Sequence, residues 1–301
     1  MSSSLKEAIS SSKQFWKTFS STFGTSSRLR VGSILFAMLA GLALFEHPIN
    51  NYRIGRDPTS YGSYSLLLPM SFEHPLGTDH FGRDVLALQL LGLKYSLLIG
   101  VIAGGMATLI GVAVAVTAGY MGGKWDLTLN SLVNTLLVLP LLPIAMVLVA
   151  YVKVDLILLS LFLAIFSWPW TARAVRAQIL TLKERPFVEL AKVSGLNSYE
   201  IMFMEILPNL IPYIGAGFAG SVVGTILAET GLRLVGLGPG NLPSLGFLLY
   251  WAMSWGFIAQ RRYQMVAPPI LLLVLTFVSL NLINSGLEEI FNPRLKKVTG
   301  L

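Results

Sequence analysis

The sequence predicts an all-α polytopic membrane protein with six transmembrane helices. Three observations lead to this fold class. Of the 301 residues, 54% are hydrophobic and only 12% are charged, whereas about 25% of the residues in a soluble domain are charged. The mean hydropathy is +0.68. The apolar residues form long uncharged blocks instead of amphipathic stripes, so much of the surface does not face water.

Six uncharged runs mark the expected membrane segments. A spanning helix needs roughly 20 predominantly apolar residues, and the runs are too long and too uniformly apolar for the strands of a membrane barrel. The first run is short and requires flanking residues to complete a span. The runs are Val31–Phe45, Tyr95–Gly123, Leu127–Val152, Leu156–Ala172, Ile206–Ala228 and Tyr263–Leu287.

Charge predicts the orientation and the domain boundaries. With the N-terminus inside, most lysines and arginines fall on inner segments, as the positive-inside rule requires. We therefore expect both termini to be cytoplasmic in a cell-membrane protein. The expected parts are a cytoplasmic tail over 1–30, a transmembrane domain over 31–290 and a second cytoplasmic tail over 291–301. The net charge of +7 fits this topology, and we do not interpret it as nucleic-acid binding.

Composition excludes several kinds of chemistry. The chain has no cysteine and only three histidines, so disulfides and cysteine metal sites are absent. No nucleotide-binding loop of the form G-x-x-x-x-G-K-[ST] is present, so the chain does not bind ATP through such a loop. No histidine or aspartate lies within a membrane run, which argues against an intramembrane enzyme. An ion-coupled secondary transporter normally has buried charges near the bilayer midplane, and we find none.

The stretch 186–208 predicts two short helices joined by a sharp turn on the cytoplasmic face. Pro186 suits the first turn of a helix, and Gly195 suits its left-handed end. Asn197 is expected to cap a second helix, with Glu200 as its reciprocal partner. Pro208 suits the start of the next helix. The stretch fits a rigid docking knob, but also an ordinary surface hairpin.

Small and charged residues in this stretch are candidates for contact with another protein chain. Ala191 and Gly195 are expected to permit close approach by a second protein, and Glu189 to offer a charged contact. The pattern Glu189-x-Ala191-x-x-x-Gly195, followed by Leu207 and Pro208, resembles the EAA loop of ABC importer permeases. The resemblance implies that these five residues couple the permease to an ATPase subunit. The sequence departs from the family at Leu190 and Glu205.

Two other constellations leave alternatives open. Gly77, Asp79, Gly82, Arg83 and Asp84 form a Gly-rich stretch beside His74 and His80. It fits a tight turn in which Arg83 pairs with Asp79 or Asp84, and less well a metal site such as one for nickel. Glu229 and Arg233 are four residues apart, a spacing that permits an intrahelical pair. We expect that pair to be either structural or part of an outer gate.

Residues 70–295 resemble the second permease of the dipeptide, oligopeptide and nickel branch of ABC importers. The residues that carry this wider resemblance are the signature 74–85, the turn 118–126, the stretches 172–176 and 226–238, and the ending 281–294. The resemblance implies a type I ABC importer permease fold with a cytoplasmic coupling helix–turn–helix. The expected substrate is a peptide or a similar small solute, with oligosaccharides or nickel as alternatives.

The resemblance also implies the partners. They are a second homologous permease, two ABC ATPase subunits, an extracytoplasmic solute-binding protein and the lipid membrane. ATP and Mg are expected on the ATPase subunits, and no cofactor, metal or catalytic residue on this chain.

Overall fold

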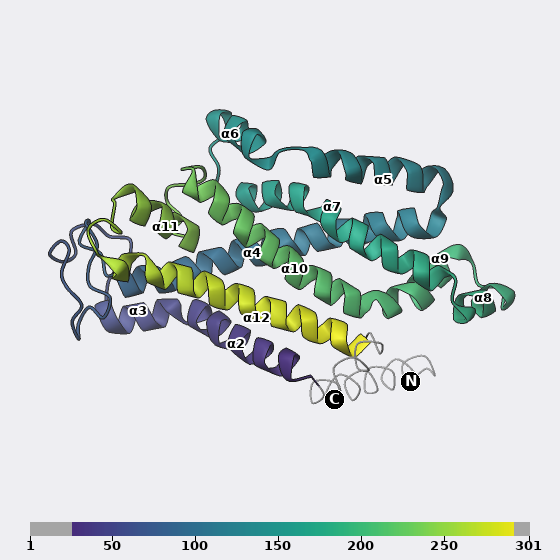
Figure 1. The fold of residues 1–301 in the computed structure, drawn as a ribbon, viewed down its shortest axis with the longest axis horizontal. Helices are drawn as coiled ribbons and strands as arrows, with labels where there is room; N and C mark the ends of the chain where they lie inside the picture. Colours follow the sequence, from purple (N-terminus) through teal and green to yellow (C-terminus); the bar gives the residue numbers. More distant parts are fainter. Residues whose placement is uncertain (1–25, 292–301) are drawn as a thin grey trace, which may run out of the picture.

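The computed structural model describes residues 26–291, and within that range the regular elements are helices (Figure 1). The long helices are α2 (Ser27–Leu44), α4 (Val85–Val116), α5 (Gly123–Val138), α7 (Leu156–Lys183), α10 (Leu207–Leu234) and α12 (Ala267–Phe291). The shorter helices are α3 (Glu46–Ile54), α6 (Leu141–Tyr151), α8 (Pro186–Val193), α9 (Ser198–Glu200) and α11 (Leu245–Ser254). Two π-helical segments, η1 (Thr117–Met121) and η2 (Ile201–Ile206), and the 3-10 turn η3 (Tyr263–Met265) complete the set.

Within the described range, five helices are long and apolar enough to cross a membrane, and the α5–α6 pair raises the number to six if it forms one bent span. This agrees with the six expected helices, with one correction. The run Leu127–Val152 was expected to be one helix, but α5 and α6 meet at 79°. Leu139, which precedes Pro140, is extended. A residue before proline is disfavoured in the α-helical region, so the helix ends there.

Two helices extend past the apolar runs that predict them. Helix α4 begins at Val85, not at Tyr95, because Asp84 caps it by accepting a hydrogen bond from the Ala87 amide at 2.8 Å. Helix α7 continues beyond Ala172 to Lys183. The uncharged run therefore understates the length of each helix, and the added part of α4 is mostly buried within the protein. The tails 1–25 and 292–301, including part of both expected cytoplasmic tails, lie outside the described residues.

Helices α4, α7 and α10 form the centre of the bundle, while α2 and α12 lie side by side along it (Figure 1). Glycine permits the closest crossings. A Cβ added at Gly104 of α4 would lie 2.8 Å from the backbone nitrogen of Val222 in α10. A Cβ at Gly111 would lie 2.9 Å from the backbone oxygen of Trp168 in α7. Small residues at these positions therefore bring three helix backbones together.

The two ends of the bundle differ in structure. One end carries α8 and α9 and is called the α8 end; the other carries the long segment 55–84, α3 and α11 and is called the loop end (Figure 1). A cluster of buried apolar side chains lies at the α8 end. Another cluster, centred on Leu93, Val222 and Ile226, joins α2, α4, α10, α11 and α12.

Candidate functional site

Helix α8 has the ends that the sequence predicts. Pro186 occupies its first turn. At the other end, Gly195 has a φ of +85°. The Gly195 amide donates to the Lys192 carbonyl at 3.1 Å, and the Leu196 amide donates to the Ala191 carbonyl at 3.2 Å. These two bonds form a Schellman motif, in which a left-handed residue closes the helix.

The second helix differs from the expectation of a separate short element. Asn197 and Glu200 form the predicted capping box. Helix α9 then continues through the π-helical η2 into α10 without a turn, and Pro208 lies in the first turn of α10. The α8–α9 turn is therefore attached directly to a spanning helix. Both π-helical segments, η1 and η2, contribute to the cluster at the α8 end, and π-helical turns are frequent at functional sites.

Helix α8 is anchored on one side and exposed on the other. Val188 and Ala191 are buried against a cluster that includes Ile179, Ile201 and Ile206. On the outer side, Glu189 is exposed, and Leu190 and Val193 are 68% and 86% exposed. Ala191 therefore packs against its own chain, whereas the sequence led us to expect it to permit approach by another chain. Gly195 is exposed, with open space around it.

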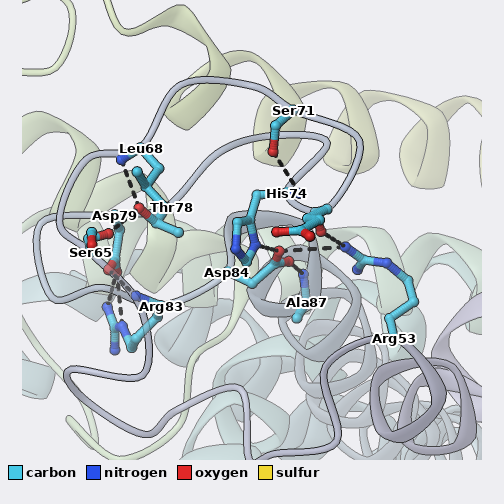
Figure 2. Close-up of polar contacts among 11 residues, drawn as sticks. Arg53, Ser65, Leu68, Ser71, His74, Thr78, Asp79, Arg83, Asp84 and Ala87 are labelled. Atoms are coloured by element: carbon cyan, nitrogen blue, oxygen red, sulfur yellow. Dashed lines mark hydrogen bonds and ion pairs between the residues drawn. The ribbon is translucent and has the colours of Figure 1, made fainter.

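The Gly-rich stretch at the loop end is a tightly bonded turn (Figure 2). Asp79 accepts hydrogen bonds from the amides of Phe81 and Arg83, each at 2.9 Å. Its other oxygen pairs with the Arg83 guanidinium at 2.6 Å. Gly77 and Gly82 have positive φ angles, and a Cβ at either would overlap a backbone carbonyl oxygen. Glycine is thus required at both positions.

Asp84 joins the turn to two helices (Figure 2). One oxygen caps α4, and the other lies 2.8 Å from Nδ1 of His74 and 3.4 Å from the Arg53 guanidinium at the end of α3. All of these groups hold the loop in place. Within residues 26–291, no group of three metal-binding side chains is present. The geometry fits the interpretation of residues 77–84 as a tight turn held by ion pairs. Arg83 pairs with Asp79 and not with Asp84.

His80 lies in an aromatic cluster that the sequence did not predict. Its ring centroid lies 3.9 Å from that of Phe81 and 3.8 Å from that of Trp255, with Trp251 at 5.5 Å. Neither ring nitrogen has a hydrogen-bond partner within the described chain. Burial lowers the pKa of His80 below its ordinary value of 6.5; Asp79 opposes this shift and Arg83 adds to it. The ring is therefore favoured in its neutral form.

Glu229 and Arg233 form a buried ion pair at 2.9 Å that holds α11 against α10. Arg233 also donates to the carbonyls of Pro239 and Leu242 in the connection before α11. The Ser244 hydroxyl, which caps α11, donates to Glu229 at 2.6 Å. Sequence spacing suggested the pair, but it could not show that Ser244 joins it.

A cavity of about 680 Å³ opens between α5, α6, α7, α10 and α12. Four residues with hydroxyl groups line it: Ser167, Thr171, Tyr213 and Ser221. The Thr171 and Ser221 hydroxyls lie 2.8 Å apart and join α7 to α10. The remaining lining is mostly apolar or glycine. A cavity of this size and lining is typical of sites for small organic solutes. No motif in the sequence marks it, because its residues come from distant segments.

Comparison of the sequence with known protein families identifies the family of this chain. Residues 107–297 match the family described as binding-protein-dependent transport system inner membrane component. The chain belongs to this family. The matched range includes α8, the Glu229–Arg233 pair and the residues that line the cavity, whereas the turn 77–84 precedes it. The resemblance to ABC importer permeases that the sequence suggested is thereby confirmed.

Several curated relatives of this permease family resemble the chain over most of its length. The oligopeptide transport system permease protein OppC of Mycobacterium bovis is 34% identical, over 76% of this chain and 79% of the relative. The dipeptide permease DppC of Haemophilus influenzae is 28% identical over 95% of both chains. The glutathione permease GsiD of Pectobacterium atrosepticum is 29% identical, over 94% of this chain and 91% of the relative.

A solved structure has the same permease fold. The chain resembles a chain of the MetNI methionine ABC transporter in an inward-facing conformation, with a TM-score of 0.53 and 19% sequence identity. The match covers 66% of this chain and 96% of the other. At this level of identity the likeness shows the fold alone. It confirms the predicted class, an all-α importer permease domain.

Proposed function

We propose that this chain is the second of two pore-forming permeases in an ABC importer for short peptides, working by alternating access. In this proposal a homologous permease completes the pathway, two ATPase subunits bind and hydrolyse ATP with Mg, and an extracytoplasmic binding protein delivers the solute. This chain is then a transport subunit without catalytic residues or a cofactor of its own. The α8 end faces the cytoplasm together with both termini, in a cell membrane.

The structure of the α8 end is the observation that carries this proposal. The exposed face of α8 presents Glu189, Leu190 and Val193. Its buried face packs on η2 and belongs to one apolar cluster with side chains from α4, α7 and α10. A protein that pushes α8 therefore moves three spanning helices together, because packed interiors transmit displacement instead of absorbing it. In this scheme Glu189 and Gly195 shape the docking surface, while Ala191, Leu207 and Pro208 hold it on the bundle.

The same scheme assigns a role to the loop end. The turn made by Gly77, Asp79, Gly82, Arg83 and Asp84 would brace the extracytoplasmic surface. The Glu229–Arg233 pair would hold α11 over the outer end of the bundle. A buried pair of this kind is stable only in one geometry, since removing either partner leaves an uncompensated charge. It acts as a structural pair in this conformation and would release α11 only if the outer gate opened.

Peptides are the substrate that the observations favour. The relatives named above transport oligopeptides, dipeptides or glutathione. The cavity of about 680 Å³ lies within the range of roughly 300–1,000 Å³ that holds small organic molecules. No histidine lines it, which disfavours nickel in comparison with an organic solute. Oligosaccharides remain the alternative within the same family.

The coupling role is tested by reversing one charge on α8. The complex is purified through a tag on this chain, from cells that carry Glu189→Lys or the matched control Glu184→Lys. Both residues are exposed, but Glu184 ends α7 before the knob begins. We expect the first variant to lose ATPase subunits or solute-stimulated ATPase activity, and the control to keep both. If no ATPase subunit co-purifies with the natural chain or with either variant, the proposal is wrong.

A further inference from the structure

We propose that Glu288 makes this cavity selective for solutes that carry an ammonium group, such as the free N-terminus of a peptide. The inference rests on the proposed function and extends it to a specificity-determining residue. Among the described residues that line the cavity, Glu288 is the one charged residue. The remaining polar side chains in this lining are uncharged, so Glu288 is the charge that the described part of this chain presents to a solute there.

The polar groups of the cavity are ordered along the bundle axis. The bond between Thr171 and Ser221 places these two residues at one level. On α7, Gln178 follows Thr171 by two turns, and on α10 Tyr213 precedes Ser221 by about the same distance. At 1.5 Å per residue, both lie roughly 10–12 Å closer to the α8 end. Both side chains line the cavity, so its polar character increases toward that end.

Helix α12 completes this polar end with two acceptors. Asn284 and Glu288 are one helical turn apart and both line the cavity, as residues at i and i+4 share one face. The Asn284 side-chain oxygen is buried and has no hydrogen-bond partner within the described chain. A buried acceptor without a donor is costly. A solute ammonium or amide N–H would satisfy it beside the carboxylate if the Asn284 side chain turned its oxygen into the cavity.

The neighbouring carboxylate has a structural contact that the described residues do not provide for Glu288. Glu289 accepts a hydrogen bond from the Ser26 hydroxyl at 3.0 Å and so ties the end of α12 to the start of α2. No described residue makes a hydrogen bond or ion pair of this kind with Glu288, which is exposed. The two adjacent glutamates therefore face different surroundings, and they provide a matched pair of variants.

The electrostatic effect is large enough to measure. A unit charge about 4 Å from a carboxylate gains roughly 1 kcal/mol in water, and more where the surroundings exclude water. A solute with a free ammonium group would be favoured about fivefold to tenfold over the same solute with that charge removed. Acetylation of a dipeptide removes the ammonium charge, so comparing the two dipeptides between variants at position 288 isolates the contribution of Glu288.

The experiment compares uptake of dialanine and N-acetyl-dialanine by the complete importer in vesicles. The permease carries Glu288→Gln, Glu289→Gln or the natural sequence, with the same binding protein throughout. Because the binding protein is common, a change in the ratio of the two uptake rates between variants reports on the permease. We expect Glu288→Gln to reduce the preference for dialanine about fivefold, and Glu289→Gln to leave it unchanged. Glu288→Lys should shift the ratio further in the same direction.

The outcomes separate the two proposals. If the natural complex imports dialanine and Glu288→Gln keeps the full preference, the inference about Glu288 is overturned and the importer function stands. The same holds if both glutamine variants change the ratio equally, because the effect is then not specific to the cavity. If the natural complex imports neither dipeptide while its ATPase subunits co-purify, the peptide proposal and this inference fail together, and the assignment as a permease remains.

Discussion

The loop end and the α8 end are held together by different forces. At the loop end, buried polar groups meet in fixed pairs: Asp79 with Arg83, Asp84 with His74, and Glu229 with Arg233. At the α8 end, apolar side chains such as Val188, Ile179 and Ile206 form the contact. The ion pair nearest to that end, Asp126–Arg176, is about a quarter exposed on each side.

The difference indicates what each end can do. Hydrogen-bonded ion pairs are directional, and breaking one in a buried site costs several kcal/mol. Apolar contacts are not directional, so a surface of isoleucine, valine and alanine side chains can move as a unit with a smaller penalty. The loop end is therefore built to hold one geometry, whereas the α8 end is suited to transmitting movement from a partner to the bundle.

The largest effect on stability is expected from breaking the buried Glu229–Arg233 ion pair, which we compare with the partly exposed Asp126–Arg176 pair. Arg233 is 2% exposed and Arg176 is 26% exposed. Replacing Arg233 with leucine leaves Glu229 buried without its charged partner, with only the Ser244 hydrogen bond remaining, so we expect a loss of about 3–5 kcal/mol in the free energy of unfolding. Replacing Arg176 with leucine should cost less than about 1 kcal/mol, because its pair is partly solvated. Thermal unfolding of the detergent-solubilised complex measures both.

A compensating variant sharpens this contrast. The double replacement Glu229→Leu with Arg233→Leu removes both charges, so it should recover part of the stability lost by Arg233→Leu alone. Equal losses for the Arg233 and Arg176 variants would show that the loop end is not held by its buried pairs.

A smaller effect is expected from glycine replacements, again one at each end. Gly82 and Gly195 both have positive φ angles, +70° and +85°, which cost an alanine roughly 1–2 kcal/mol. At Gly82 the added methyl would also overlap the Tyr64 carbonyl, whereas at Gly195 it would meet open space. We expect Gly82→Ala to destabilise the protein by about 3 kcal/mol, and Gly195→Ala by about 1 kcal/mol. Melting temperatures of the two variants, compared with Gly62→Ala, provide the check.

Gly62 is the matched control for the loop end. It has a φ of +67° and no atom near the position of an added Cβ, so its variant isolates the backbone term. If Gly62→Ala and Gly82→Ala were equally unstable, the close approach of Tyr64 would not be part of the constraint.

The smallest expected effect is a pH dependence confined to the loop end. The pKa of the half-buried His80 lies below its ordinary value of 6.5 in the folded protein. At a pH between the His80 pKa of the folded state and that of the unfolded state, the unfolded state binds more protons than the folded state. The stability therefore falls as the pH falls below about 6.5, and it is constant above that pH. Hydrogen exchange of residues 78–84, corrected for the intrinsic rate, should become faster as the pH is lowered from 7 to 5.

A phenylalanine at position 80 provides the control, because it fills the aromatic cluster without titrating. This variant should lose that pH dependence, while hydrogen exchange at α8 should be insensitive to pH in both proteins. Exchange that accelerates equally at both ends would contradict a local role for His80.

Local chemistry made several features predictable from the sequence. Asn197, Glu200 and Gly195 specify the ends of α8 and α9 because caps depend on residues only three or four apart. The same is true of the Glu229–Arg233 pair, whose members are four residues apart, whereas the sequence left Arg83 to pair with Asp79 or Asp84 and the structure decided for Asp79. The inward orientation of Ala191 was not predictable in this way, because it depends on the helices that α8 packs against.

The sequence by itself determined that the chain is helical and membrane-spanning, where α8 begins and ends, and which permease family it resembles. These follow from hydropathy, capping and short motifs, all of which act over a few residues. Only the tertiary structure decided the bend between α5 and α6, the aromatic surroundings of His80, and the cavity in which Ser221 and Glu288 take part. The physical reason is that helix packing brings together residues far apart in the chain, and no local pattern records which faces will meet.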